Sequence, residues 1–384
     1  MKKIFLILLL ILLSLNSLAQ HNCIQNSTNR YPGAVRADSI LTIRIAVVGD
    51  MMCHSPQFKY SQVSKDSFDF VPVFRYVNKY LADADFTIGN LETVTAGNDK
   101  KYSGYPFFNS PDEFITAVKS AGFNLVTTSN NHALDRGEFG IKRTIAQLIK
   151  NDLNSTGTFT SQHDRDSIRM FDIKGINTAF LSYSYGTNGI PIPGGKKYLI
   201  NIIDYDLIRQ DITSARQLGA DLVIVYFHFG EEYKREPSPF QKTTINKTIE
   251  MGADIILGGH PHVLEPAVYF KTHNAKLDSG FAVYSLGNFL SNQRKRFTDG
   301  GSILYLNISK NINAGSLWIS SVEFLPTWIY RGQTDRGNEY LILPAKNEQD
   351  YPFLHESDKR IMQTSFEDSR YILHKYTSQI HFVK

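Results

Sequence analysis

Apolar and polar residues along the chain form blocks that are typical of alternating strands and helices. A β-branched run at 43–48 ends in Gly49-Asp50, and apolar residues recur with helical spacing at 71–81. The expected strands in this part are 43–48, 86–88, 123–128, 178–183, 222–227 and 254–257. The expected helices are 71–81, one that opens with Ser110 as N-cap and Pro111 at its first position, 138–150, 205–218 and 239–251.

The pattern changes in the last third of the chain, where strands follow one another without helices between them. These strands are expected at 267–270, 281–284, 302–308 and 317–324, and a helix is expected around 358–371. Alternating strands and helices followed by a strand-rich end indicate a layered α/β sandwich.

The N-terminus has the pattern of a secretory signal peptide. Lys2 and Lys3 precede an unbroken apolar run at 4–13, and Ser17-Leu18-Ala19 supplies small residues two apart. We therefore expect a signal peptide at 1–19, a flexible leader at 20–40, and export to the periplasm or cell envelope. The alternative is an uncleaved signal that anchors the chain in the membrane.

Charge and cysteine content narrow the classes of function. The 384 residues carry a formal charge of +4, which is too weak to indicate a nucleic-acid partner. There are two cysteines, Cys23 and Cys53, and two do not form a disulfide scaffold. We expect Cys53 to serve packing and Cys23 to have no special role.

Five polar clusters each follow an expected strand directly. They are GDMMCH at 49–54, GNLET at 89–93, SNNHALDRG at 129–137, FHFGEE at 227–232 and GGHPH at 258–262. In an open α/β sheet, ligands bind outside the carboxyl ends of the strands, so clusters far apart in sequence can meet there. Glu231 and Glu232 of the fourth cluster are expected to lie in solvent.

The residue types in these clusters are those of a metal site. Four of these histidines and two of the carboxylates are already more than one tetrahedral ion needs, which favours two ions that share a carboxylate. They are His132, His228, His260, His262, Asp50 and Glu92. Each cluster alone has a simpler interpretation. His228 could be a structural histidine, Asp50 a helix N-cap, and Asn130-Asn131 a turn. The joint occurrence favours one or two divalent transition metal ions, with Mn, Fe and Zn all open.

The ordered motifs resemble the bacterial capsule-synthesis (CapA, poly-γ-glutamate) family, within the calcineurin-like metallophosphoesterase superfamily. The resemblance spans 43–326 and includes GDMM, GNLET, SNNHALDRG, HFGEEY, GGHPHV, YSLGNF at 284–289 and FLPTW at 324–328. It implies a four-layer αββα sandwich with mixed sheets at 41–330, followed by a C-terminal appendage at 331–384.

The resemblance also implies roles for individual residues. Asp50, Asn131, His228, His260 and His262 match ligands of the superfamily, and His132 matches the histidine that assists catalysis. The expected metal ligands are Asp50, His54, Asn90, Glu92, Asn131, His228, His260 and His262. His132 and Asp50 are the expected catalytic residues, and backbone amides near Gly287 and Asn288 are expected to orient substrate.

Two positions depart from the phosphoesterase pattern. The third position of the Asp-x-His motif is Met52, so His54 is an alternative ligand two residues later. Asn90 stands where a bridging aspartate is usual, and the longer side chain of Glu92 could substitute for it. Both departures argue against ordinary phosphoesterase chemistry.

The combined interpretation is an exported capsule-synthesis protein that acts on or guides an anionic polymer. The alternatives are a metal-dependent phosphoesterase acting on a phosphoester substrate, and a non-catalytic assembly component that kept the fold. Expected partners are the polymer or phosphoester itself and membrane proteins of capsule polymer synthesis.

Overall fold

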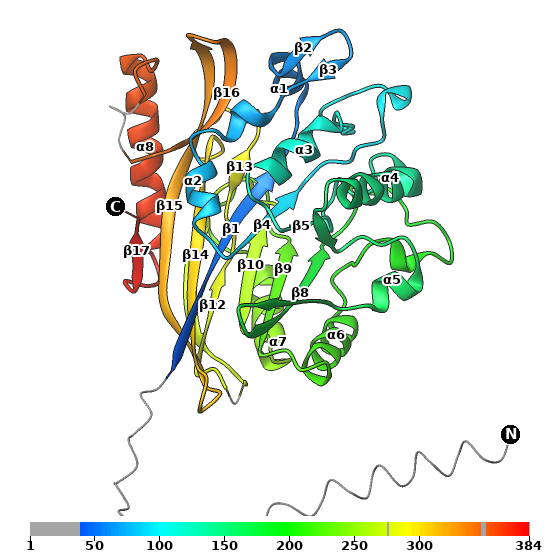
Figure 1. Cartoon of the computed structure of the whole chain (residues 1–384), viewed down its shortest axis with the longest axis vertical. Helices are drawn as coiled ribbons and strands as arrows, with labels where there is room; N and C mark the ends of the chain where they lie inside the picture. The colour runs from blue at the N-terminus through cyan, green and yellow to red at the C-terminus, as the bar shows by residue number, and fades with distance from the viewer. Residues whose placement is uncertain (1–38, 275, 347–350, 384) are drawn as a thin grey trace, which may run out of the picture. The chain divides into compact units, whose positions relative to one another are not determined.

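Two β-sheets pack face to face in this chain (Figure 1). The computed structural model describes residues 39–274, 276–346 and 351–383. The larger sheet has the order β16-β15-β14-β1-β4-β5-β6, with β13 paired to β1 and β17 paired to β15. The smaller sheet has the order β11-β12-β10-β9-β8-β7. The strands are β1 (Ile40–Met51), β4 (Phe86–Leu91), β5 (Leu125–Thr127), β6 (Asn154–Thr156), β7 (Arg169–Ile173), β8 (Ile176–Ser184), β9 (Leu222–His228), β10 (Ile255–Gly259), β11 (Ala267–Lys271), β12 (Ser279–Val283), β13 (Asn288–Leu290), β14 (Gly300–Asn311), β15 (Leu317–Thr334), β16 (Gly337–Pro344) and β17 (Ile380–Phe382), with a separate hairpin of β2 (Gln62–Ser64) and β3 (Ser67–Phe68).

Both sheets are mixed, as the family resemblance implies. β1, β4, β5 and β6 pair in parallel, whereas β14, β15 and β16 continue the same sheet in antiparallel pairing. In the smaller sheet, β8, β9, β10 and β12 are parallel, and β7 and β11 add antiparallel edges.

Alternation along the strands explains the layers. In β1, Ile43, Ile45 and Val47 face the smaller sheet and belong to the core between the sheets. Ala46 and Val48 face the other way, in a second core with the helices of that side. Helices cover the outer faces of both sheets, so the predicted four-layer αββα sandwich is confirmed (Figure 1).

The helices on the two sides of the sandwich come from different parts of the chain. The larger sheet is covered by η1 (Val71–Phe74), α2 (Asn78–Ala82), α3 (Glu113–Ser120) and α4 (Gly137–Lys150). The smaller sheet is covered by α6 (Tyr205–Gln217) and α7 (Pro239–Glu250). Other helices are α1 (Ser55–Tyr60), η2 (Asn98–Lys100), α5 (Gln162–Asp166), η3 (Lys197–Leu199) and α8 (Glu356–Leu373).

Two predicted helices differ in the structure. The continuous helix at 71–81 is wrong, because i→i+3 bonds such as Arg75 N–H to Pro72 O close tight turns there and direct Phe74 into the core. The start at Ser110 is also wrong. Asp112 is the N-cap of α3, and the Ser110 hydroxyl lies 2.6 Å from that of Thr93 instead.

The last part of the chain adds to the larger sheet. Position 331 lies inside β15, β16 pairs with β15 along its length, and β17 runs parallel to β15. The helix expected around 358–371 is α8, which packs on β14 and β15 (Figure 1).

Some predictions concern residues outside the described part. The signal peptide at 1–19, the leader up to residue 38 and Cys23 all lie there. Cys53 is a buried free thiol in the core of the larger sheet. None of the helices in the described ranges is long and apolar enough to span a membrane.

Candidate metal centre

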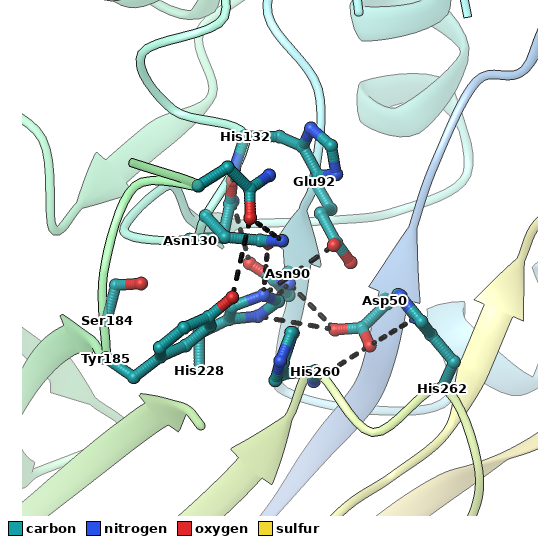
Figure 2. Close-up of polar contacts among 12 residues, drawn as sticks. Asp50, Asn90, Glu92, Asn130, His132, Ser184, Tyr185, His228, His260 and His262 are labelled. Carbon is teal, nitrogen blue, oxygen red and sulfur yellow. Dashed lines mark hydrogen bonds and ion pairs between the residues drawn. The ribbon is translucent and has the colours of Figure 1, made fainter. Parts of the chain in front are cut away.

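The predicted polar clusters meet where strands of both sheets end (Figure 2). Asp50 lies at the end of β1, Glu92 just after β4, and His228 is the last residue of β9. His260 and His262 follow β10 directly. Parallel strands expose their carboxyl ends at one edge, so side chains from distant parts of the sequence come together there.

Two glycines allow this close approach. A Cβ atom on Gly259 would lie 2.2 Å from the Tyr226 hydroxyl and 2.6 Å from Asp50 Oδ1. A Cβ atom on Gly49 would lie 2.0 Å from the Gly287 carbonyl oxygen. No side chain larger than hydrogen fits at either position unless the backbone moves.

The two histidines after β10 occupy unusual backbone conformations. His260 has φ 96° and His262 has φ 59°, a region that residues with a Cβ rarely adopt. The Asp50 carboxylate helps to hold this turn, because its Oδ2 accepts a 3.0 Å hydrogen bond from the His260 backbone N–H. Such strain clusters at functional sites.

Asp50 is a buried carboxylate that stays ionised. Its Oδ1 accepts a 2.8 Å hydrogen bond from Asn90 Nδ2, and its Oδ2 lies 3.5 Å from His262 Nδ1. Burial raises the pKa of Asp50, but hydrogen bonding to His262, the charges of His228 and His262, and the bond from Asn90 together bring the pKa down to about 2. A permanently charged oxygen in this position is suited to bind a cation.

Glu92 is a buried carboxyl group of the centre that lacks hydrogen-bond partners among the described residues. It is fully buried, and neither carboxylate oxygen has a hydrogen-bond partner among the described residues. Oε1 lies 3.6 Å from His228 Nε2. Burial, followed by the charge of Asp50, raises the pKa of Glu92 well above its usual range. A buried carboxyl group with no partner is costly, and a bound cation would remove that cost.

Three groups of side chains could each hold an ion. They are Glu92, His228 and His260; Asp50, Glu92 and His262; and Glu232, His260 and His262, with the ligand atoms of each group within 4.8 Å of one another. Glu92 belongs to two of the groups, which fits a carboxylate shared by two ions.

The histidines are in the form that binds metals. Burial, then the charge of His260, lowers the pKa of His228 well below its usual range. Burial and the charge of His262 lower the pKa of His260 to about 3. Both imidazoles are therefore neutral at physiological pH, and Nδ1 of His260 has no hydrogen-bond partner in the described part of the chain.

Asn90 connects two of these side chains rather than presenting its oxygen to them. Its Nδ2 lies 2.8 Å from Asp50 Oδ1 and 3.2 Å from His228 Nδ1 (Figure 2). Its Oδ1 accepts hydrogen bonds from Thr127 and Asn130.

Asn131 lies on the other side of the same imidazole. Its Oδ1 is 2.7 Å from His228 Nε2, and its Nδ2 donates a 3.0 Å hydrogen bond to Asn188 Oδ1. The amide oxygen of Asn131 thus faces the group that contains His228.

His132 forms a pair with a carboxylate. Its Nδ1 lies 2.8 Å from Asp135 Oδ2, and the ring packs edge-on against Phe108 at 4.7 Å. The same Asp135 oxygen accepts a 2.7 Å bond from the Phe108 N–H. The carboxylate and the aromatic ring fix the imidazole, which leaves Nε2 available to another group.

His54 lies outside the three groups. Its Nδ1 accepts a 3.3 Å hydrogen bond from the Asn292 backbone N–H and lies 3.2 Å from Gln57 Oε1. Burial lowers the pKa of His54 to about 4. The side chain therefore contacts the segment after β13 through the nitrogen nearest its backbone.

Gly287 and Asn288 are buried beneath the centre. The Gly287 N–H donates to Ser285 Oγ at 3.2 Å, and its carbonyl accepts the Asp50 N–H at 2.9 Å. Asn288 Oδ1 lies 3.1 Å from His262 Nδ1. In this structure both residues contact the residues of the centre, and the Gly287 amide is already bonded within the protein.

Three residues near the centre had no role in the sequence prediction. The Tyr185 ring lies 4.5 Å from that of His260, and the Tyr226 hydroxyl lies 3.5 Å from Asp50 Oδ1. Tyr226 precedes His228 by two positions on β9, so strand alternation could have placed it on the same face. Glu232 is exposed as expected, but its carboxylate also belongs to the third group.

The fold and the site define an α/β sandwich with a candidate two-ion centre at the strand ends. Comparison with known proteins then gives the family. The family described as bacterial capsule synthesis protein PGA_cap matches residues 44–293. This match covers more than half of the chain, and the chain belongs to that family.

Sequence relatives agree with this assignment. The chain is 31% identical over 278 residues to the capsule biosynthesis protein CapA of Bacillus anthracis, a match that covers 70% of this chain and 64% of that protein. It is 28% identical over 280 residues to the PGA biosynthesis protein CapA of Bacillus subtilis, covering 72% and 70%.

Solved structures are only weakly similar to this chain. The NAD nucleotidase of Haemophilus influenzae has a TM-score of 0.46 at 12% identity, covering 90% of this chain and 64% of that one. A calcineurin-like phosphoesterase of Bacillus subtilis has a TM-score of 0.42 at 12% identity, covering 87% and 99%.

Proposed function

We propose that this chain is an exported capsule-synthesis protein that acts on or guides an anionic polymer such as poly-γ-glutamate at a metal centre. Family membership and the two CapA relatives support the capsule role. The centre would hold one or two divalent ions of Mn, Fe or Zn. Membrane proteins of polymer synthesis would be its partners in the envelope.

The position of Glu92 carries the metal part of this proposal. Its carboxylate is fully buried, has no hydrogen-bond partner in the described ranges, and is shared by two of the three candidate groups. A buried, unpaired carboxylate persists only where something else compensates it. A divalent cation between Glu92 and the neutral histidines is the simplest compensation.

The side chains divide into those that would hold the ion and one that would move a proton. Asp50, Glu92, His228, His260 and His262 supply the donor atoms, with Asn131 Oδ1 beside them. A bound divalent ion would polarise a carbonyl or phosphoryl oxygen of the substrate. His132, oriented through Nδ1 by Asp135, would give or take a proton through Nε2.

Phosphoester hydrolysis is the second candidate, because a carboxylate shared by two groups also suits the two-ion chemistry of phosphoesterases. Two residues weigh against it. Met52 is buried and offers no strong ligand, and Asn90 directs its amide nitrogen, not its oxygen, toward Asp50.

The deciding experiment combines a measurement in cells with an assay of the purified protein. Cells in which the chain is replaced by the His132→Ala variant are measured for surface polymer, and purified wild-type protein is assayed on a generic phosphodiester with added manganese. Loss of polymer with slow phosphodiester turnover supports the capsule function. Rapid phosphodiester turnover by the wild type contradicts it, and normal polymer with the variant would indicate a non-catalytic component.

A further inference from the structure

A pocket lies between α8 and the segment that joins β13 to β14. It has a volume of about 450 Å³ and is lined by Arg294, Arg296 and Phe297 from that segment and by Arg360 and Ile361 from α8, among others. None of its lining residues belongs to the three candidate metal groups. The pocket is therefore a feature separate from the metal centre.

The three arginines of the pocket are unequally engaged. Arg296 is paired with Asp368 through two bonds of 2.8 and 2.9 Å. Arg294 donates one hydrogen bond to the Ile329 carbonyl at 2.7 Å. Among the described residues, the Arg360 guanidinium has no hydrogen bond or ion pair, and the exposed Glu356 one helical turn earlier acts on it through its charge alone. Donor groups of Arg294 and Arg360 thus remain available to a ligand.

The acidic residues of the pocket are already engaged. Asp368 is bound to Arg296, and buried Asp299 accepts a 2.8 Å hydrogen bond from Trp328 Nε1. Neither carboxylate neutralises Arg360. The pocket therefore presents more positive than negative charge to solvent, and its free donors suit an anion.

Phe297 gives the pocket an apolar wall in a strained position. Its φ is 75°, which is rare for a residue with a Cβ. The guanidinium of Arg235 stacks on its ring at 4.3 Å and that of Arg296 at 4.9 Å. Ile361 of α8 is also exposed at the pocket. Methylene groups between the charges of a ligand could lie against this surface.

Two chain segments connect this pocket to the metal centre. One begins at Asn288, which contacts His262, and reaches Arg294 six residues later. The other follows β9, carries Glu232 of the third metal group, and ends with Arg235 against Phe297. A ligand that extends from the centre along these segments would meet the arginines of the pocket.

We propose that this pocket is a second binding site for an extended polycarboxylate, whose carboxylates contact Arg294 and Arg360 while another part of the same chain lies at the metal centre. The planar fork of arginine matches a carboxylate in two parallel hydrogen bonds. The apolar wall suits a polymer that separates its charges by methylene groups. This inference rests on the proposed handling of an anionic polymer.

The test measures binding of a fluorescently labelled γ-linked oligoglutamate by anisotropy. The variant Arg294→Gln/Arg360→Gln is compared with Arg209→Gln/Lys150→Gln, which removes two charges from exposed positions in α6 and α4. An exposed charge contact contributes about two- to fivefold in affinity, so the pocket variant, which loses two contacts, should bind about 4- to 25-fold more weakly and depend less on salt. The control should stay within about twofold of wild type. Melting curves verify that each variant is folded.

Other outcomes overturn the proposal. Equal binding by wild type and the pocket variant, equal losses in the control, or no oligoglutamate binding by the wild type would each refute it. Binding to phosphatidylglycerol vesicles but not to oligoglutamate would indicate a membrane surface instead. The His260→Ala/His262→Ala variant separates the two claims, because it changes the metal centre and leaves the pocket intact. If the wild type holds no metal, and only the pocket variant, not the histidine variant, loses oligoglutamate binding, the metal proposal fails and the pocket stands.

Discussion

Replacing Glu92 by glutamine should change stability in opposite directions with and without metal. In the metal-free protein, the carboxyl group of Glu92 is buried without a hydrogen-bond partner among the described residues. Glu92→Gln should therefore leave the metal-free protein as stable as wild type or more stable. In the metal-loaded protein, the same change removes a negative charge that two candidate groups share.

The expected size of the loss follows from charge and distance. Two unit charges about 4 Å apart interact by roughly 4 kcal/mol at an effective dielectric constant of about 20. Metal affinity should fall by about 100- to 1000-fold, which lowers the stabilisation by bound metal by about 2.7–4.1 kcal/mol. At an unfolding entropy of about 2 cal/mol/K per residue, the metal-dependent rise in melting temperature should shrink by about 4–6 °C.

Unlike Glu92→Gln, Asn90→Ala should lower the stability of the metal-free protein. Its amide bonds Asp50, Thr127 and Asn130, so its removal leaves buried partners unpaired and costs about 1–3 kcal/mol in the metal-free protein. Because Asn90 contacts the expected ligands Asp50 and His228, its replacement should weaken metal binding by only about 10- to 100-fold. The exposed Glu231→Gln serves as a matched carboxylate control that should leave metal binding unchanged, because Glu231 belongs to none of the three groups.

The assay is thermal unfolding of each protein, stripped with a chelator and then titrated with manganese or zinc. If Glu92→Gln keeps the metal-dependent shift in melting temperature while Asn90→Ala loses it, Glu92 is not the shared ligand. Asn90 would then hold the bridging position, and Glu92 would only support it.

Three further predictions address other parts of the molecule. His132→Ala should keep metal and fold but lose function by about 10²–10⁴-fold, and Asp135→Asn should lose less; loss of metal in His132→Ala would contradict the assigned role. Burial raises the pKa of Glu265 to about 8, so the folded state holds a proton that the unfolded state releases, and stability should fall as pH rises from about 4.5 to 8. Glu265→Gln should reduce the change in the free energy of unfolding across this pH range by roughly 3–6 kcal/mol, as measured by denaturant unfolding at several pH values. An unchanged pH dependence in the variant would refute this prediction. N-terminal sequencing of envelope protein should begin at Gln20, whereas an intact Met1 would indicate a membrane anchor.

Local patterns predicted the layered α/β class and the central strands, because those strands could be recognised from a few neighbouring residues, whereas β6, β7 and β16 were not predicted. The four-layer arrangement came from the family resemblance. The alternation in β1 and the apolar runs of β9 and β10 are visible in sequence, and so are the polar residues that follow them. Since strand ends share an edge of the sheet, the meeting of Asp50, His228 and His260 could be predicted as well.

Long-range contacts explain what the sequence could not provide. The direction of the Asn90 amide depends on Thr127 and Asn130 from another part of the chain. Ser110 does not cap α3 because its hydroxyl pairs with Thr93. The basic pocket is formed by Arg294 and Arg360, which no local pattern connects.

The most direct test of the metal centre is elemental analysis of the purified protein after dialysis against metal-free buffer. Wild type should retain about one or two equivalents of a first-row transition metal, and His260→Ala/His262→Ala should retain almost none, because all three candidate groups contain at least one of these histidines. A metal-free wild type that also fails to bind added manganese or zinc, or a double variant with full metal content, would contradict the account.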